Sequence, residues 1–216
     1  MRSFLSEKRY SVGGGVEMMD IVMAGVGGQG VMLASRILGR AAQLEGYKVS
    51  ITVTRGLAQR GGSVVNFVRF YRDGEMVSPI IPMGKADILV GFEMLESLRR
   101  LMYLRKEGIV ILNVREIHPI NVKMQRDNYP REKDIISAMS KIARSVYTIN
   151  AREIARTIGN PRAENIVILG FLTGLRIIPI TRDSIVNAIK VLIPEKYMES
   201  NLRAFEMGLR KGKEAK

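Results

Sequence analysis

The hexapeptide GVGGQG at residues 25–30 is the strongest indication of the fold of this chain. A short apolar run at residues 21–24 precedes it, and Val31, Ala34, Leu38 and Ala41 follow it at helical spacing. This order predicts a strand, a tight glycine turn and a helix, and a second strand at residues 49–53 completes a βαβ unit. A G-x-G-x-x-G turn lets the backbone approach a phosphate at the start of the helix, although tight turns of this form also occur without a ligand.

A second glycine-rich segment, GLAQRGGSV at residues 56–64, follows the second predicted strand. Ligands of open α/β sheets bind at the carboxyl ends of the strands, so both glycine-rich segments are expected at one edge of the sheet. Arg60 offers a planar guanidinium for a phosphate or a carboxylate. The alternative is a flexible crossover loop whose arginine is solvated.

The rest of the chain alternates between strand-like and helix-like patterns. We expect a hairpin made of strands at residues 64–70 and 76–81, then a strand at 88–92, a helix at 93–105 and a strand at 109–112. A helix at 132–144 and a strand at 146–149 follow, and the C-terminal part reads as helices at 151–158, 163–175, 181–192 and 194–209. The predicted fold is α/β and Rossmann-like, with a mostly parallel sheet, helices on both faces and a β-hairpin excursion. Residues 1–17 are expected to form a flexible N-terminal extension, residues 18–209 the domain, and residues 210–216 a basic C-terminal tail.

Composition excludes several classes of chemistry. The sequence has no cysteine, so it supplies no disulfide, no thiolate zinc site and no iron–sulfur ligands. Its single histidine, His118, cannot make a histidine-based metal site alone, and no metal site is expected. The net charge of +13 is spread along the chain and aromatic residues make up only 6%, which argues against a nucleic-acid partner. No apolar run is long enough to suggest a membrane span, and we expect a cytoplasmic protein without a membrane partner.

The order of several motifs resembles a known family, the γ-type domain of the 2-oxoacid:ferredoxin oxidoreductases. The resemblance covers about residues 20–208 and includes GVGGQGVMLASRILGRAA at 25–42, GLAQRGGSVVNFVRF at 56–70, VSP at 77–79, GKAD at 84–87, GFE at 91–93 and NLRAFEMG at 201–208. Within that family, the QRGGS form at 59–63 is more similar to the indolepyruvate ferredoxin oxidoreductase β subunits than to the pyruvate or oxoglutarate enzymes.

The resemblance implies a heteromeric enzyme that decarboxylates an aryl 2-oxoacid on thiamine diphosphate, reduces ferredoxin through iron–sulfur clusters and forms an acyl-CoA. Thiamine diphosphate, Mg and the clusters would reside on a larger α subunit, because Asp73-Gly74 lacks the preceding glycine of a thiamine diphosphate motif. The isolated chain would be inactive, hold no cofactor alone and contact coenzyme A. Its catalytic residues stay unknown, and the binding candidates are Gly25, Gly27, Gly28, Gln29, Gly30, Gln59, Arg60, Gly61, Gly62, Ser63 and Lys85.

Two alternatives remain open from the residues. The same subunit role could serve pyruvate, 2-oxoglutarate or a branched-chain 2-oxoacid. A different class is a free-standing NADP- or nucleotide-binding Rossmann protein, in which Arg55 takes the place of the acidic ribose ligand and accepts a 2′-phosphate. Glu93 and Asn113 are predicted to cap helices rather than bind a ligand, and His118 is predicted to be a solvated loop residue.

Overall fold

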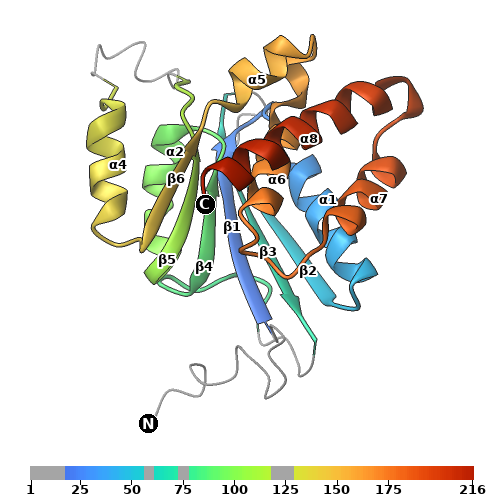
Figure 1. The fold of residues 1–216 in the computed structure, drawn as a ribbon. Helices are drawn as coiled ribbons and strands as arrows, with labels where there is room; N and C mark the ends of the chain where they lie inside the picture. Colours follow the sequence, from blue (N-terminus) through green and yellow to red (C-terminus); the bar gives the residue numbers. More distant parts are fainter. Residues whose placement is uncertain (1–17, 56–60, 73–77, 118–128) are drawn as a thin grey trace.

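The computed structural model describes residues 18–55, 61–72, 78–117 and 129–216, and these form one six-stranded sheet with helices on both faces (Figure 1). The strands are β1 (Met18–Val26), β2 (Lys48–Arg55), β3 (Ser63–Tyr71), β4 (Ala86–Gly91), β5 (Leu104–Asn113) and β6 (Ser145–Ile149). The helices are α1 (Val31–Leu44), α2 (Met94–Arg99), α4 (Glu132–Ser140), α5 (Ala151–Thr157), α6 (Glu164–Gly174), α7 (Arg182–Leu192) and α8 (Met198–Glu214). The α/β prediction with a mostly parallel sheet is confirmed.

The strand order is β2-β3-β1-β4-β5-β6. Strands β1, β4, β5 and β6 pair in parallel, whereas β3 is antiparallel to both of its neighbours, β1 and β2. The antiparallel hairpin is therefore formed by β2 and β3. The hairpin expected between residues 64–70 and 76–81 is wrong, because residues 78–82 form no strand in the structure. The strand at residues 64–70 lies inside the sheet, and all seven residues are buried.

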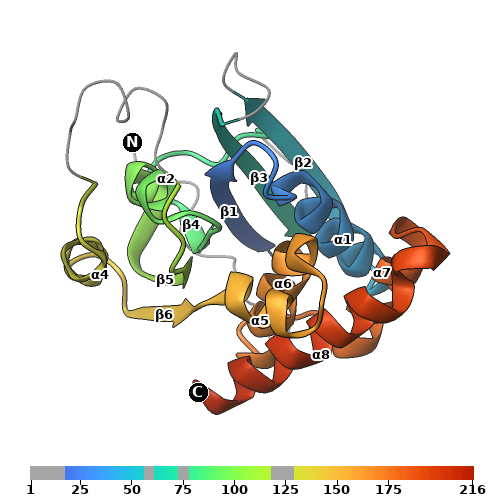
Figure 2. The same cartoon turned by 90° about the horizontal axis from the view of Figure 1, so that it is seen from above.

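Helices cover the sheet in two unequal groups. Figure 2 shows α1, α5, α6, α7 and α8 on one face and α2 and α4 on the other. The larger core contains residues of β1, α1 and α6, and the smaller core contains residues of β4, α2 and α4. Burial on both faces explains why the central strands read as nearly continuous apolar runs.

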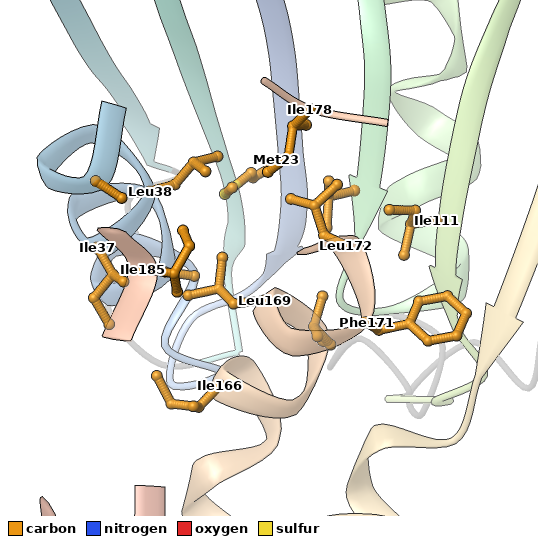
Figure 3. Packing of buried hydrophobic residues seen from close by; sticks show 14 of the residues in the cluster. Met23, Ile37, Leu38, Ile111, Ile166, Leu169, Phe171, Leu172, Ile178 and Ile185 are labelled. Atoms are coloured by element: carbon orange, nitrogen blue, oxygen red, sulfur yellow. The ribbon is translucent and has the colours of Figure 1, made fainter. Parts of the chain in front are cut away.

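Helix α6 is buried on all sides because it lies between the sheet and α8. Its side chains Ile166, Leu169, Phe171 and Leu172 point into the larger core, where Met23 of β1 and Ile111 of β5 meet them (Figure 3). A helix that is apolar all round requires such a buried position. Its other side meets α8 at glycines: a Cβ added to Gly170 would lie 2.1 Å from the carbonyl oxygen of Phe205.

Three expected boundaries differ from the structure. The helix expected at 93–105 ends at Arg99, and β5 already begins at Leu104, because a 3-10 turn at Leu101–Tyr103 reverses the chain. The basic tail expected at 210–216 continues α8 as far as Glu214, and Gly212 is buried against α6. Residues 1–17 lie outside the described residues. In the described part of the chain, every helix falls short of the length and apolarity that a bilayer span requires.

Candidate functional site

The two glycine-rich segments meet at the carboxyl edge of the sheet. The amide of Gly27 donates a 2.8 Å hydrogen bond to the carbonyl oxygen of Gly62. Gly28, Gly30 and Gly61 have φ angles of 102°, 75° and 76°, a region that side chains with a Cβ disfavour. Gly28 and Gly61 are exposed, so the outer side of this paired turn is open to solvent.

Gln29 holds the first turn in place from inside. Its Oε1 accepts a 2.8 Å hydrogen bond from the amide of Val26, and its Nε2 donates a 2.8 Å bond to the carbonyl oxygen of Phe92. The side chain is only 8% exposed. Gln29 was predicted to contact a cofactor, but the structure places it as a buried brace between the ends of β1 and β4.

A buried polar network continues from Gln29 along this edge. The Nε2 of Gln29 lies 3.5 Å from Oε1 of Glu164, the first residue of α6. The side-chain nitrogen Nδ2 of Asn113 donates to the same Oε1 at 2.7 Å and to the carbonyl oxygen of Phe92 at 3.0 Å. The other carboxylate oxygen of Glu164 forms an ion pair with Arg115. The ends of β1, β4 and β5 are therefore tied to the start of α6 by side chains.

Burial sets the electrostatics of the Arg115–Glu164 pair. Desolvation raises the pKa of the Glu164 carboxyl, although Arg115 and the hydrogen bonds from Asn113 and Gln29 oppose the shift. Desolvation lowers the pKa of Arg115, and the nearby charges of Arg152 and Arg156 lower it further. Like-charged guanidinium groups that crowd one another in this way favour an additional negative charge nearby.

Glu93 fixes the next part of the edge. Its carboxylate accepts a 2.7 Å bond from the amide of Glu96, which confirms the predicted role as the N-cap of α2. It also accepts a 3.2 Å bond from the amide of Ile117 and a bond from the hydroxyl of Tyr129. Burial and the contact with Glu93 raise the pKa of Tyr129. One carboxylate thereby joins Ile117 and Tyr129. His118 lies outside the described residues.

A basic pocket of about 390 Å³ opens beside the network. Its lining combines the loop after β5 with the start of α5 and consists of Val114, Arg115, Glu116, Asn150, Arg152, Glu153 and Arg156. Arg152 and Arg156 lie one helical turn apart, so both reach the same opening. Asn113 was predicted as a helix cap, and its Oδ1 accepts a 2.9 Å hydrogen bond from the backbone amide of Ala151 at the start of α5. No trio of His, Cys, Asp or Glu side chains in the described residues could hold a metal ion.

The structure brings some predicted site residues together and separates one. The carboxyl edge holds eight of them: Gly25, Gly27, Gly28, Gln29, Gly30, Gly61, Gly62 and Ser63. The hydroxyl of Ser63 accepts a 3.0 Å hydrogen bond from Arg100. Gln59 and Arg60 lie outside the described residues. Lys85 directly precedes β4, so it lies at the opposite edge and cannot act with the glycine turns. Sequence reasoning missed Arg115, Arg152, Arg156 and Glu164, which no local motif marks.

The insertion of β3 bears on the dinucleotide alternative. In a Rossmann domain the strand after the first helix lies next to the first strand, and its end meets the ribose. Here β3 lies between β1 and β2, so the end of β2 lies about 10 Å from β1, twice the strand spacing. The end of β2 therefore lies one strand farther from β1 than the ribose site of a Rossmann domain.

The fold and this edge define an α/β domain that presents glycine turns and a buried polar network at the carboxyl ends of its parallel strands. The chain belongs to the pyruvate ferredoxin/flavodoxin oxidoreductase family, whose model matches residues 20–211. The resemblance seen in the motifs is thus confirmed.

Curated relatives cover nearly the whole chain. The indolepyruvate oxidoreductase subunits IorB of Thermococcus kodakarensis and Archaeoglobus fulgidus are 37% and 39% identical, over 90% and 88% of this chain and 96% and 93% of their own lengths. A 2-oxoglutarate synthase subunit KorC of Methanocaldococcus jannaschii is 30% identical, over 90% of this chain and 94% of its own length.

Solved structures share the fold. The γ subunit of a keto/oxoacid ferredoxin oxidoreductase from Geobacter sulfurreducens matches with a TM-score of 0.64 and 22% identity, over 91% of this chain and 99% of its own. The 2-oxoglutarate:ferredoxin oxidoreductase from Magnetococcus marinus, solved with 2-oxoglutarate, coenzyme A and succinyl-CoA, matches with a TM-score of 0.72 and 17% identity, over 94% of this chain and 32% of its own.

Proposed function

We propose that this chain is the cluster-free subunit of a thiamine diphosphate-dependent 2-oxoacid:ferredoxin oxidoreductase of the indolepyruvate type. The reaction is the oxidative decarboxylation of an aryl 2-oxoacid to an acyl-CoA with reduction of ferredoxin. The observation that carries the proposal is the 37–39% identity to IorB subunits over nearly the full length of both chains. The 30% identity to a 2-oxoglutarate synthase subunit KorC supports the general 2-oxoacid chemistry but gives no support to the aryl substrate.

The proposal requires a larger α subunit. Iron–sulfur clusters need cysteine thiolates, and this sequence has none. The partner would therefore hold the clusters together with thiamine diphosphate and Mg, pass electrons to ferredoxin, and leave the isolated chain inactive. The proposal also includes a cytoplasmic location and residues 18–209 as the γ-type domain, after a separate extension at 1–17.

Within the complex, the carboxyl edge of this chain would contact coenzyme A, whose thiol supplies the acyl acceptor when it is bound. The residues fit an anionic group, because Gly30 precedes α1 without a side-chain cap and the first amides of the helix remain available as donors. The open sides of Gly28 and Gly61 admit close approach by a phosphate. Arg152 and Arg156 supply positive charge at the neighbouring pocket, and Arg60 remains a proposed contact.

Co-expression with a thiamine-binding, cysteine-rich α subunit tests this function. We expect a stable complex that reduces a dye with indolepyruvate and coenzyme A faster than with pyruvate, 2-oxoglutarate or branched-chain 2-oxoacids, and no turnover by either chain alone. A complex without turnover on any of these 2-oxoacids would refute the function, and a preference for an aliphatic acid would refute the substrate. Tight binding of NADPH by the lone chain in calorimetry would favour the dinucleotide alternative instead.

A further inference from the structure

Strand β2 leaves one side of the sheet open. It is an edge strand of eight residues that pairs only with β3. The bond between Gly27 and Gly62 shows that the even-numbered residues of β3 direct their backbone groups toward β1. Because this direction alternates along an antiparallel ladder, the odd-numbered residues of β3 bond to the even-numbered residues of β2. By this alternation the backbone groups of Val49, Ile51 and Val53 point outward, away from β3. No hydrogen bond within the described residues satisfies these outward groups.

A groove runs beside this open edge. Gly39 lets β2 lie close beneath α1, because a Cβ there would come within 2.7 Å of Cδ1 of Ile51. Even so, Val49 and Ile51 remain only partly buried, and with Leu192 of α7 they form the apolar part of a pocket of about 320 Å³. Val191, the neighbouring residue of α7, is 67% exposed. Figure 1 shows β2, α1 and α7 together at this side of the molecule.

The rim of the groove is positively charged. Arg36 and Arg40 lie one turn apart on α1 and both line the pocket with Gln43. Among the described residues, Arg36 has no ion pair, and the only side-chain bond of Arg40 is a 3.4 Å contact with Oε1 of Gln43. Two exposed guanidinium groups without carboxylate partners complement an acidic ligand.

We propose that β2 is a docking edge for an extended, acidic segment of another polypeptide, which adds to the sheet as a seventh strand. Its backbone would bond to Val49, Ile51 and Val53, alternate apolar side chains would enter the groove, and its carboxylates would pair with Arg36 and Arg40. A second copy of this chain is a poor occupant. Pairing two β2 strands about a twofold axis would set the arginines of one α1 opposite those of the other. The inference does not depend on the reaction that the complex catalyses.

The test uses the full-length chain and an eight-residue fluorescent peptide in which glutamate and valine alternate. We expect the peptide to bind in an anisotropy titration and to slow amide hydrogen exchange at Val49, Ile51 and Val53. The double variant Arg36→Glu/Arg40→Glu should weaken binding by about ten-fold or more. The matched double variant Arg203→Glu/Arg210→Glu changes the net charge equally on exposed positions of α8 and should leave binding unchanged.

Two peptide controls separate strand addition from charge attraction. Two further peptides carry N-methyl groups, one on every valine and the other on every glutamate. One of the two should lose binding, because the methylated amides can no longer bond to the edge of β2. A lysine–valine peptide should not bind. The inference would be overturned if no glutamate–valine peptide bound, if the lysine peptide bound equally well, if charge reversal on α8 had the same effect, or if the amides of β2 gained no protection.

Discussion

Gly27 and Gly62 are joined by a 2.8 Å backbone hydrogen bond, although they belong to different glycine-rich segments. The bond extends the ladder beyond Val26, the last residue of β1, and Ser63, the first residue of β3. It places the turn that precedes α1 directly against the turn that precedes β3. The two segments therefore present a single surface, which is what contact with one ligand or one partner subunit requires.

Arg60 and Lys85 were predicted together as contacts for an anion. Arg60 lies outside the described residues, and Lys85 lies at the amino edge of the sheet, away from the glycine turns. In the reconstituted complex, Arg60→Ala should raise the KM for coenzyme A by about ten-fold, the size expected for the loss of one charge-assisted hydrogen bond. Lys85→Ala, at the opposite edge of the sheet, should leave it unchanged. Steady-state kinetics at saturating 2-oxoacid measures both. Equal effects of the two substitutions would show that distance from the glycine turns does not matter.

Gln29 should stabilise the fold through its buried hydrogen bonds. Gln29→Leu leaves the amide of Val26 without its partner and removes a donor from the carbonyl of Phe92. Urea titration should show a loss of about 1–3 kcal/mol in the free energy of unfolding. Gln43→Leu, at an exposed position of α1, is the control and should change stability little. A wild-type midpoint for Gln29→Leu would mean that the brace is unimportant.

The contact between α6 and α8 should tolerate no methyl group. In Gly170→Ala the new Cβ would lie 2.1 Å from the carbonyl oxygen of Phe205, so the two helices must move apart. Overpacking of this kind costs about 1–3 kcal/mol in unfolding free energy. Thermal melts of the full chain measure it, with Arg203→Ala on the exposed side of α8 as the control. Unchanged melting of Gly170→Ala would contradict the close helix packing.

The buried Glu164 should make stability depend on pH in a defined direction. Its raised pKa means that the folded chain binds a proton at this carboxyl more tightly than the unfolded chain does. Its contribution to stability is therefore full below the ordinary pKa of 4.5 and is lost as the pH rises through the raised value. Relative to Glu164→Gln, the wild type should gain unfolding free energy as the pH falls from neutral to about 5.

Glu45 supplies a control of opposite sign. Hydrogen bonds from Ser184 and Thr181 lower the pKa of Glu45, so its contribution is present above the ordinary value of 4.5 and is lost as the pH falls through the lowered one. Relative to Glu45→Gln, the wild type should lose unfolding free energy on acidification below about 5. Parallel trends for the two variants in urea titrations across this range would rule out the electrostatic interpretation of Glu164.

The sequence predicts the local parts of this fold well and its strand neighbours poorly. The turn at 25–30, the helix expected at 181–192 and the apolar character of α6 follow from local chemistry and match the structure. The position of β3 between β1 and β2 does not follow from local chemistry. Alternation of side chains predicts that a segment is a strand, but it does not predict which strand it pairs with. The same limit explains why residues 76–81 were wrongly paired with residues 64–70.

The candidate site divides in the same way. The glycine turns could be predicted from residue type, and the family from the order of the motifs. Arg115 and Glu164 form an ion pair across 49 positions, so no local spacing reveals it. The position of Lys85 could have been foreseen, since a residue that directly precedes a parallel strand lies at the amino edge of the sheet rather than at the ligand edge.

We propose that the paired glycine turns complete the reaction chamber of a larger subunit. Hydrogen–deuterium exchange can be measured on this chain alone and in complex with the proposed thiamine-binding subunit. Exchange at residues 27–31 and 61–63 should be slower in the complex, and slower still on addition of coenzyme A. Protection confined to the amino edge around Lys85, with these turns exchanging as in the free chain, would contradict it.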